Sequence, residues 1–110
     1  LVEAGSDFFL MPSRFEPCGL TQMYSLLYGA VPIVRGVGGL LDTVVDLDDE
    51  DGTGVVFHDF TADALWLACR RALSLWNDPA WLAEVRARGM AQDFGWEKAA
   101  RAYEAVYASP

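Results

Sequence analysis

The 110 residues are 53% apolar and 22% charged. These fractions are ordinary for a folded protein and exclude disordered, collagen-like and coiled-coil chains. A chain of 12.1 kDa forms one compact domain. The net charge of −8 would repel a phosphate backbone, and no apolar run approaches the roughly 18 residues of a membrane span. We therefore expect neither nucleic-acid nor membrane partners.

Two features bear on the origin of the chain. The sequence begins at Leu1, in what resembles the end of a helix, so we expect a fragment of a longer protein. Its two cysteines, Cys18 and Cys69, stand in unlike contexts without metal-ligand spacing. This usage favours a reducing compartment, and we expect a cytoplasmic location.

Three short apolar runs predict β-strands, at residues 7–11, 32–35 and 54–57. The first run stops at Pro12 and the second is followed by Gly36, and both residue types interrupt strands. The first run does not alternate apolar and polar side chains. This pattern is typical of a strand that is buried on both faces of a parallel sheet.

Helices are predicted between these strands. The first is indicated by apolar residues at helical spacing, which are Leu20, Met23, Leu27 and Ala30. Gly29 should end this helix, since glycine is the favoured C-terminal stop. A second, short helix is expected at residues 40–45.

Three further helices are expected after the last strand. Thr61 is a suitable N-cap for a helix that runs to about Trp76, and Asp78 with Pro79 should begin the next one. The last helix should cover residues 96–107. One stripe of it is apolar and should pack against something large: Trp96, Ala99, Ala100, Tyr103, Val106 and Tyr107.

This alternation of strands and helices predicts an α/β fold with a parallel sheet. Doubly wound domains usually carry about five or six strands, and only three are found here. We therefore expect a partial doubly wound, Rossmann-like sheet whose first strands are absent.

The loop after the first strand is the candidate site, because ligands of parallel sheets lie beyond the carboxyl ends of strands. It combines the carboxylate of Glu16, a Pro-Cys-Gly turn and the hydroxyl of Thr21 at the start of a helix. Unpaired amides at residues 18–21 would favour an anion or sugar hydroxyls, and Gly19 would let a ligand approach the backbone. A phosphorylated sugar would use both groups; the alternative is a capped helix with a solvated Glu16.

Other candidate sites are weaker. The acidic stretch at residues 46–51 does not fit an EF-hand calcium loop. If Gly52 is taken as the glycine that such a loop requires at its sixth position, Leu47 and His58 fall at the first and last positions, where calcium ligands are needed. It is expected to be a solvated loop. A hydrolase triad of Ser13, His58 and Asp42 lacks the Gly-x-Ser-x-Gly motif, and His58 is better explained as a surface residue.

Three further residue types have two interpretations each. Arg14 is either a phosphate clamp or a surface ion-pair former. Cys18 has no histidine near it in sequence, so a backbone role is favoured over that of a nucleophile. Tryptophans could stack on a glucan, but their helical spacing favours packing in the core or between domains: Trp66, Trp76, Trp81 and Trp96.

The runs at residues 9–22, 31–35 and 38–44 closely resemble bacterial glycogen synthases and plant starch synthases, and the likeness extends through 52–54 and 93–107. The resemblance implies that residues 1–110 are the C-terminal part of the nucleotide-sugar-binding domain of a GT-B glycosyltransferase. Such an enzyme moves glucose from ADP-glucose to an α-1,4-glucan acceptor with retention, without a metal or cofactor, in the bacterial cytoplasm. The N-terminal domain would be missing, so the fragment alone should be inactive.

The resemblance also implies roles for single residues. Glu16 would be catalytic, with the amides of Cys18 and Gly19 on the glucose hydroxyls and Thr21 on the diphosphate. The rest of the expected substrate-binding set is Leu20, Tyr24, Arg14, Gly38 and Gly39.

Three positions depart from the family pattern. Tyr24 stands where related transferases have a glutamate that binds ribose. Val37 replaces an expected Thr, and Gly95 replaces a Ser, which removes a side-chain N-cap from the last helix. Two other functions stay open: a GT-B transferase for a different nucleotide sugar, and a noncatalytic nucleotide-sugar-binding module.

Overall fold

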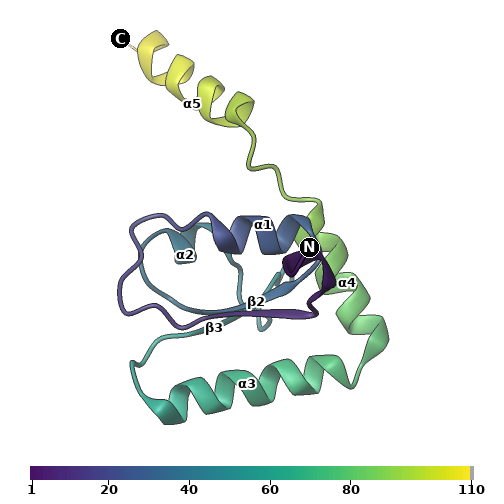
Figure 1. The fold of residues 1–110 in the computed structure, drawn as a ribbon. Coiled ribbons are helices and arrows are strands. Elements are labelled where there is room, and N and C mark those ends of the chain that lie inside the picture. The colour runs from purple at the N-terminus through teal and green to yellow at the C-terminus, as the bar shows by residue number, and fades with distance from the viewer. Residues whose placement is uncertain (110) are drawn as a thin grey trace.

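The computed structural model describes residues 1–109 and shows a three-stranded sheet with helices on both faces (Figure 1). Every predicted element is present close to its expected bounds, and the α/β class is confirmed. The elements are η1 Glu3–Gly5, β1 Phe8–Met11, α1 Thr21–Leu27, β2 Val31–Arg35, α2 Gly39–Thr43, β3 Val55–Phe57, α3 Ala62–Trp76, α4 Pro79–Met90 and α5 Trp96–Ala108.

The sheet has the order β1-β2-β3, and both strand pairs are parallel. Phe8 lies opposite Val31 and Ile33 lies opposite Val55, so β2 is the central strand. The first four residues of β2 are buried. All carboxyl ends therefore meet at one edge of the sheet, where the loops after the three strands are neighbours.

Two hydrophobic cores lie on opposite faces of the sheet. Alternate residues of β2 divide between them: Ile33 packs toward α3 and α4, whereas Val34 packs toward α1 and α2. This division follows from the strand repeat of two residues. Burial on both faces explains why the strands are apolar without alternation.

The predicted helix caps are confirmed. The Thr61 hydroxyl accepts a hydrogen bond from the Ala64 amide (3.1 Å), and the Asp78 carboxylate accepts one from the Trp81 amide (3.0 Å). The α5 helix begins after Gly95 without a side-chain cap, as the loss of Ser predicts. Within residues 1–109 no helix is long and apolar enough to cross a membrane.

The β1 strand is less buried than its sequence predicts. None of its four residues is fully buried, and Leu10 is exposed. β1 lies at one edge of the sheet and pairs with β2 alone; β3 lies at the other edge, but α3 packs against it and its three residues are buried. The edge leaves backbone donors and acceptors without a partner strand among the described residues.

The apolar residues that indicated α1 are not all buried. Leu20 and Leu27 are exposed, whereas Ala30, just after the helix, is buried. The buried residues of α1 are Gln22, Ser25 and Leu26. Two of these are polar, so hydrogen bonds replace part of the usual apolar contact beneath this helix.

The acidic loop is not simply solvated. Both carboxylate oxygens of Asp46 bind Arg71 of α3 (2.5 and 3.0 Å), and Asp46 also accepts bonds from the amides of Val56 and Asp48. Partial burial alone would raise the pKa of Asp46, but these hydrogen bonds, led by that of Arg71, hold the pKa below its ordinary value. Among residues 1–109 no acidic cluster is placed to hold a metal ion.

The tryptophans divide into three situations. Trp81 packs against the core under α3 and α4, as predicted. Trp76 is half exposed and meets Phe8 edge to face, with 6.4 Å between ring centroids. Trp66 and Trp96 are exposed, which the core interpretation did not predict.

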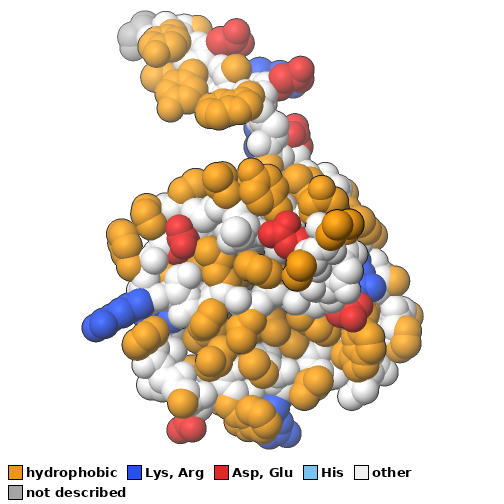
Figure 2. Space-filling view, in the orientation of Figure 1, with side chains coloured by type: hydrophobic (Ala, Val, Ile, Leu, Met, Phe, Trp, Pro, Cys, Tyr) orange, Lys and Arg blue, Asp and Glu red, His pale blue; other side chains and the backbone are white. Residues whose placement is uncertain are grey.

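The α5 helix extends away from the rest of the structure (Figure 1). None of its residues is buried, and Trp96 is 88% exposed. Apolar side chains gather on α5 and on the top of the sheet domain (Figure 2). The large partner that the sequence predicts for its apolar stripe is thus absent from residues 1–109.

We expect Asp46→Asn to destabilise the fold by about 1–3 kcal/mol, because the half-buried Arg71 guanidinium loses the carboxylate that it binds through two nitrogens and keeps only the exposed Asp48, at 3.0 Å. Asp49→Asn is the control, since Asp49 is exposed and its side chain has no partner within residues 1–109; its effect should stay within about 0.5 kcal/mol. Urea unfolding at pH 7 measures both. Equal midpoints for the two variants would show that the Asp46–Arg71 pair does not hold the loop.

The pH dependence of this pair follows from the lowered pKa of Asp46. A lowered pKa in the folded state stabilises the fold above the unfolded value, about 3.9, and this contribution disappears as the pH falls through the folded value. We expect the stability difference between wild type and Asp46→Asn to be constant from about pH 5 to 7 and to shrink below about pH 4. A constant difference down to pH 2 would contradict the assignment.

Candidate functional site

The site loop joins the carboxyl end of β1 to the start of α1 and contains the turn at residues 16–19. Gly19 has φ +74°, in the left-handed region that favours glycine. A Cβ atom on Gly19 would collide with the buried side chain of Gln22, whose amide nitrogen would lie 2.9 Å from it. Gly19 is therefore required by the loop itself, a reason that the sequence interpretation, which invoked ligand approach, did not contain.

The amides at the end of this loop have no internal partner. Among residues 1–109, no acceptor is found for the N–H groups of Cys18, Gly19, Leu20 and Thr21. Leu20 occupies the N-cap position of α1 and supplies no side-chain cap. This confirms the expected row of unpaired amides, which can donate to an anion or to hydroxyl groups.

The turn packs directly on Gly38 and Gly39. The Gly39 amide donates to the carbonyls of Glu16 and Pro17, both at 3.2 Å. A Cβ on Gly39 would lie 2.6 Å from the Cα of Cys18, and one on Gly38 would collide with the Glu16 carbonyl. The structure thus brings together four predicted site residues, with the glycines supporting the loop backbone.

Gln22 was not predicted as a site residue, but it holds this turn. Its side chain is fully buried, and Nε2 donates to the carbonyls of Cys18 (3.1 Å) and Gly19 (2.7 Å). The Thr43 hydroxyl lies 3.1 Å from Nε2, shares its two N–H groups with these carbonyls, and donates in turn to the Gly39 carbonyl (2.8 Å). One sequence signal could have indicated that Gln22 is buried: it lies four residues before the apolar Leu26, and residues at this spacing share a face of a helix.

The remaining predicted residues lie at different places around the loop. The carboxylate of Glu16 is half-buried and has no hydrogen-bond or ion-pair partner within residues 1–109. The Thr21 hydroxyl lies 3.4 Å from the sulfur of Met11. Leu20 and Tyr24 line an open groove that residues 92–96 and Ala99 close from the other side.

A second unpredicted residue, Arg35, ties two loops together at the ends of the strands. It donates to the His58 carbonyl after β3 (2.8 Å) and to the Arg14 carbonyl after β1 (3.0 Å). The guanidinium groups of Arg14 and Arg35 lie 5.6 and 5.3 Å from the ring centroid of Phe60, within range of cation–π attraction. Arg14 makes no ion pair with residues 1–109, and His58 is exposed, as expected.

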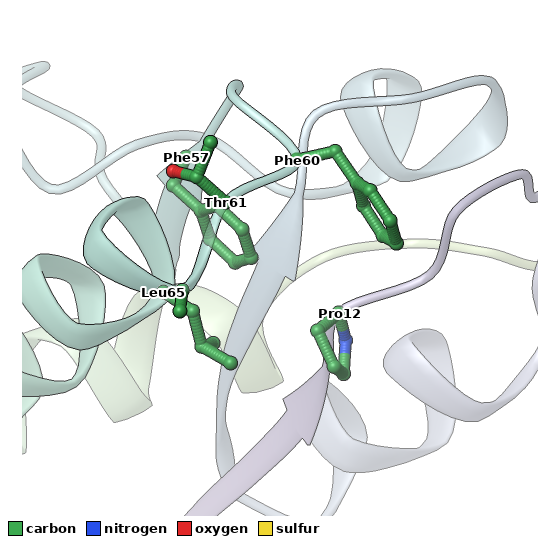
Figure 3. A pocket seen from close by; sticks show the side chains of 6 residues that line it. Pro12, Phe57, Phe60, Thr61 and Leu65 are labelled. Carbon is green, nitrogen blue, oxygen red and sulfur yellow. The ribbon is translucent and has the colours of Figure 1, made fainter.

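Beside these arginines is an apolar cavity of about 280 Å³. Figure 3 shows Phe60 and Pro12 on one side of it and Phe57 with Leu65 on the other. The cavity lies at the carboxyl edge of the sheet, next to the start of α3. Both cysteines are free, with Cys18 exposed and Cys69 half-buried.

Curated proteins match nearly the whole chain. The glycogen synthase of Myxococcus xanthus is 60% identical over 107 residues, which cover 97% of this chain and 22% of that protein. The glycogen synthase of Rhodospirillum rubrum is 54% identical over 110 residues, which cover 99% and 23%. No family model matches the chain.

Solved structures agree with these relatives. The catalytic domain of starch synthase IV from Arabidopsis thaliana, bound to ADP and acarbose, has a TM-score of 0.85 and 38% identity over 96% of this chain and 23% of its own. Over nearly its whole length the chain is similar to one part of glycogen synthases and starch synthases. A sucrose-phosphate synthase from Thermosynechococcus elongatus is more distant, with a TM-score of 0.67 and 28% identity over 99% of this chain and 27% of its own.

The chain spans roughly a quarter of the length of these relatives or less. The resemblance to glycogen and starch synthases seen in the sequence is thereby confirmed, and so is the GT-B type of fold.

The contact between the two loops predicts the effect of Gly39→Ala. The added methyl group would overlap the backbone of Cys18, so we expect a loss of about 1–3 kcal/mol in stability. Gly5→Ala is the matched control, because nothing lies within 4 Å of its Cβ position. Chemical denaturation compares the two variants; an equally small effect of both would contradict the close packing of the loops.

Proposed function

We propose that the full-length protein containing this chain transfers glucose from ADP-glucose to the non-reducing end of an α-1,4-glucan, with retention of configuration. Its identity to glycogen synthases, 60% and 54% in two cases, supports this function. The solved starch synthase IV domain was bound to ADP and acarbose, which supports a nucleotide and a glucan-like ligand at this fold. No metal or cofactor is part of the proposal.

One observation carries the assignment of the donor site. The turn places a carboxylate without an internal partner, that of Glu16, next to a row of amides that also lack one. A carboxylate accepts hydrogen bonds from hydroxyls, whereas N–H groups donate to hydroxyls or phosphate oxygens. A sugar phosphate offers both kinds of partner.

We assign roles within this loop accordingly. Glu16 acts on the donor glucose, and the amides of Cys18 and Gly19 hold its hydroxyls. The amide and hydroxyl of Thr21, with the amide of Leu20, face the diphosphate. These donors are fixed before the substrate arrives, which lowers the reorganisation needed as charge develops on the leaving diphosphate.

We propose that four residues around this loop also contribute to binding of the nucleotide sugar. Arg14 would approach a phosphate from the Phe60 side, and Tyr24 would take the place of the ribose-binding glutamate. Gly38 and Gly39 would act through the turn that they support. The base of the nucleotide would be set by residues that precede this chain.

We also propose that residues 1–110 form the C-terminal part of the nucleotide-sugar-binding domain, in a bacterial cytoplasmic enzyme. The unpaired edge of β1 supports further strands on that side, and the uncovered stripe of α5 supports a further packing partner. A cleft between two domains would then have only one wall here, so the isolated chain should not transfer glucose.

The decisive variant is Glu16→Gln in the full-length enzyme. It preserves shape but weakens the acceptor, and we expect the turnover to fall by at least roughly 100-fold while the melting temperature stays close to wild type. Glu84→Gln on the exposed side of α4 is the control and should retain full turnover. Near-normal turnover of Glu16→Gln would refute the site.

The choice of donor is measured on the same enzyme by calorimetry with ADP-glucose and UDP-glucose. Tighter binding of ADP-glucose is expected. Preference for UDP-glucose would favour the transferase with a different nucleotide sugar, and donor binding without any glucose transfer would favour the noncatalytic module.

A further inference from the structure

The side chain of Gln22 connects α1 to the site loop through several hydrogen bonds. It is 0% exposed, and its amide nitrogen reaches the Cys18 carbonyl, the Gly19 carbonyl and the Thr43 hydroxyl. Burial of an amide without hydrogen bonds is unfavourable, and the Oε1 atom of Gln22 has no partner within residues 1–109. The acceptors around Nε2 are therefore what favours an amide at this position. A purely packing role would be filled better by an apolar side chain.

The carbonyls that Gln22 holds belong to the peptides whose N–H groups lie in the site. A peptide unit is planar and trans, so the direction of its carbonyl fixes the direction of its N–H. The Cys18 carbonyl therefore sets the N–H of Gly19, and the Gly19 carbonyl sets the N–H of Leu20. Both N–H groups lack an acceptor within residues 1–109.

Gln22 also links the turn to α2. The Thr43 hydroxyl accepts from Gln22 and donates to the Gly39 carbonyl, and the Gly39 amide donates to the Glu16 carbonyl. The four groups form one continuous path from α1 through α2 back to the turn. Rotation of either peptide at residues 18–20 would break its hydrogen bond to Gln22, the first group of this path.

We propose that Gln22 is a positioning residue for the donor: it orients the Gly19 and Leu20 amides by holding the carbonyls on the other side of the same two peptides. The inference rests on the proposed function of the loop. Gln22 itself is buried and does not touch the donor. Its effect is on the binding of the nucleotide sugar and not on that of the glucan acceptor.

The test uses Gln22→Met in the full-length enzyme, because methionine has a similar length and no N–H group. Ser25→Ala is the matched control: Ser25 is equally buried on α1, but its hydroxyl donates only to the Thr21 carbonyl within the helix. Steady-state kinetics give the KM for ADP-glucose and for glycogen separately. Thermal unfolding measures stability.

We expect Gln22→Met to raise the KM for ADP-glucose about tenfold or more, as two amide donors lose their alignment. The KM for glycogen should stay unchanged, and Ser25→Ala should leave both values near wild type. If Gln22→Met does not fold, Thr43→Val decides, since it removes the anchor of Gln22 and keeps the residue. It should raise the donor KM by a smaller factor and leave the glycogen KM unchanged.

Two results would overturn the inference. The first is a KM for ADP-glucose in Gln22→Met that equals the value in Ser25→Ala. If Gln22→Met is unfolded, the same equality in folded Thr43→Val has the same meaning. The other is an equal rise of the donor and glycogen KM values, which indicates general loosening of the fold. Wild-type enzyme without ADP-glucose-dependent transfer would instead refute the proposed function, so the two failures are distinguishable.

Discussion

The backbone of residues 16–18 lies so close to Gly38 and Gly39 that neither glycine can carry another carbon atom. This contact joins the loop after β1 to the loop after β2, and the Gly39 amide binds both the Glu16 and Pro17 carbonyls across it. The positions of the Glu16 carboxylate and of the free amides depend on this contact, because they belong to the same short turn. Gln22 and Thr43 close it from the inner side.

The fold could be predicted well where local chemistry decides it. Thr61 and Asp78 cap their helices as their side chains suggest, and apolar runs mark all three strands. The apolar spacing indicated α1 but not its buried face, where Gln22 lies while Leu20 and Leu27 are exposed. Hydrophobic spacing finds a stripe on a helix, but the neighbour that covers it is set by the rest of the fold.

The site was predictable only in part, for a related reason. The order of residues in one loop predicts a carboxylate beside unpaired amides, and the structure shows no partner for these groups within residues 1–109. The hydrogen bonds that hold the loop join residues that are distant in sequence. Gln22 and Thr43 are 21 residues apart, and Arg35 and His58 are 23 residues apart. Asp46, which resembles its acidic neighbours in sequence, differs from them because Arg71 lies 25 residues away. A single sequence carries no local pattern for such pairs.

The polar underside of α1 has a consequence for how the site moves. The turn is held by directional bonds between peptide groups and two side chains, and few apolar groups would enter water if it opened. Such an opening changes the heat capacity and the denaturant-sensitive surface very little. Native-state hydrogen exchange at the Gly39 amide, which is bonded to the Glu16 and Pro17 carbonyls, would therefore be nearly independent of urea. The amides of β2, in contrast, exchange only when the core itself is exposed. The turn can therefore open and close without unfolding of the sheet on which it lies.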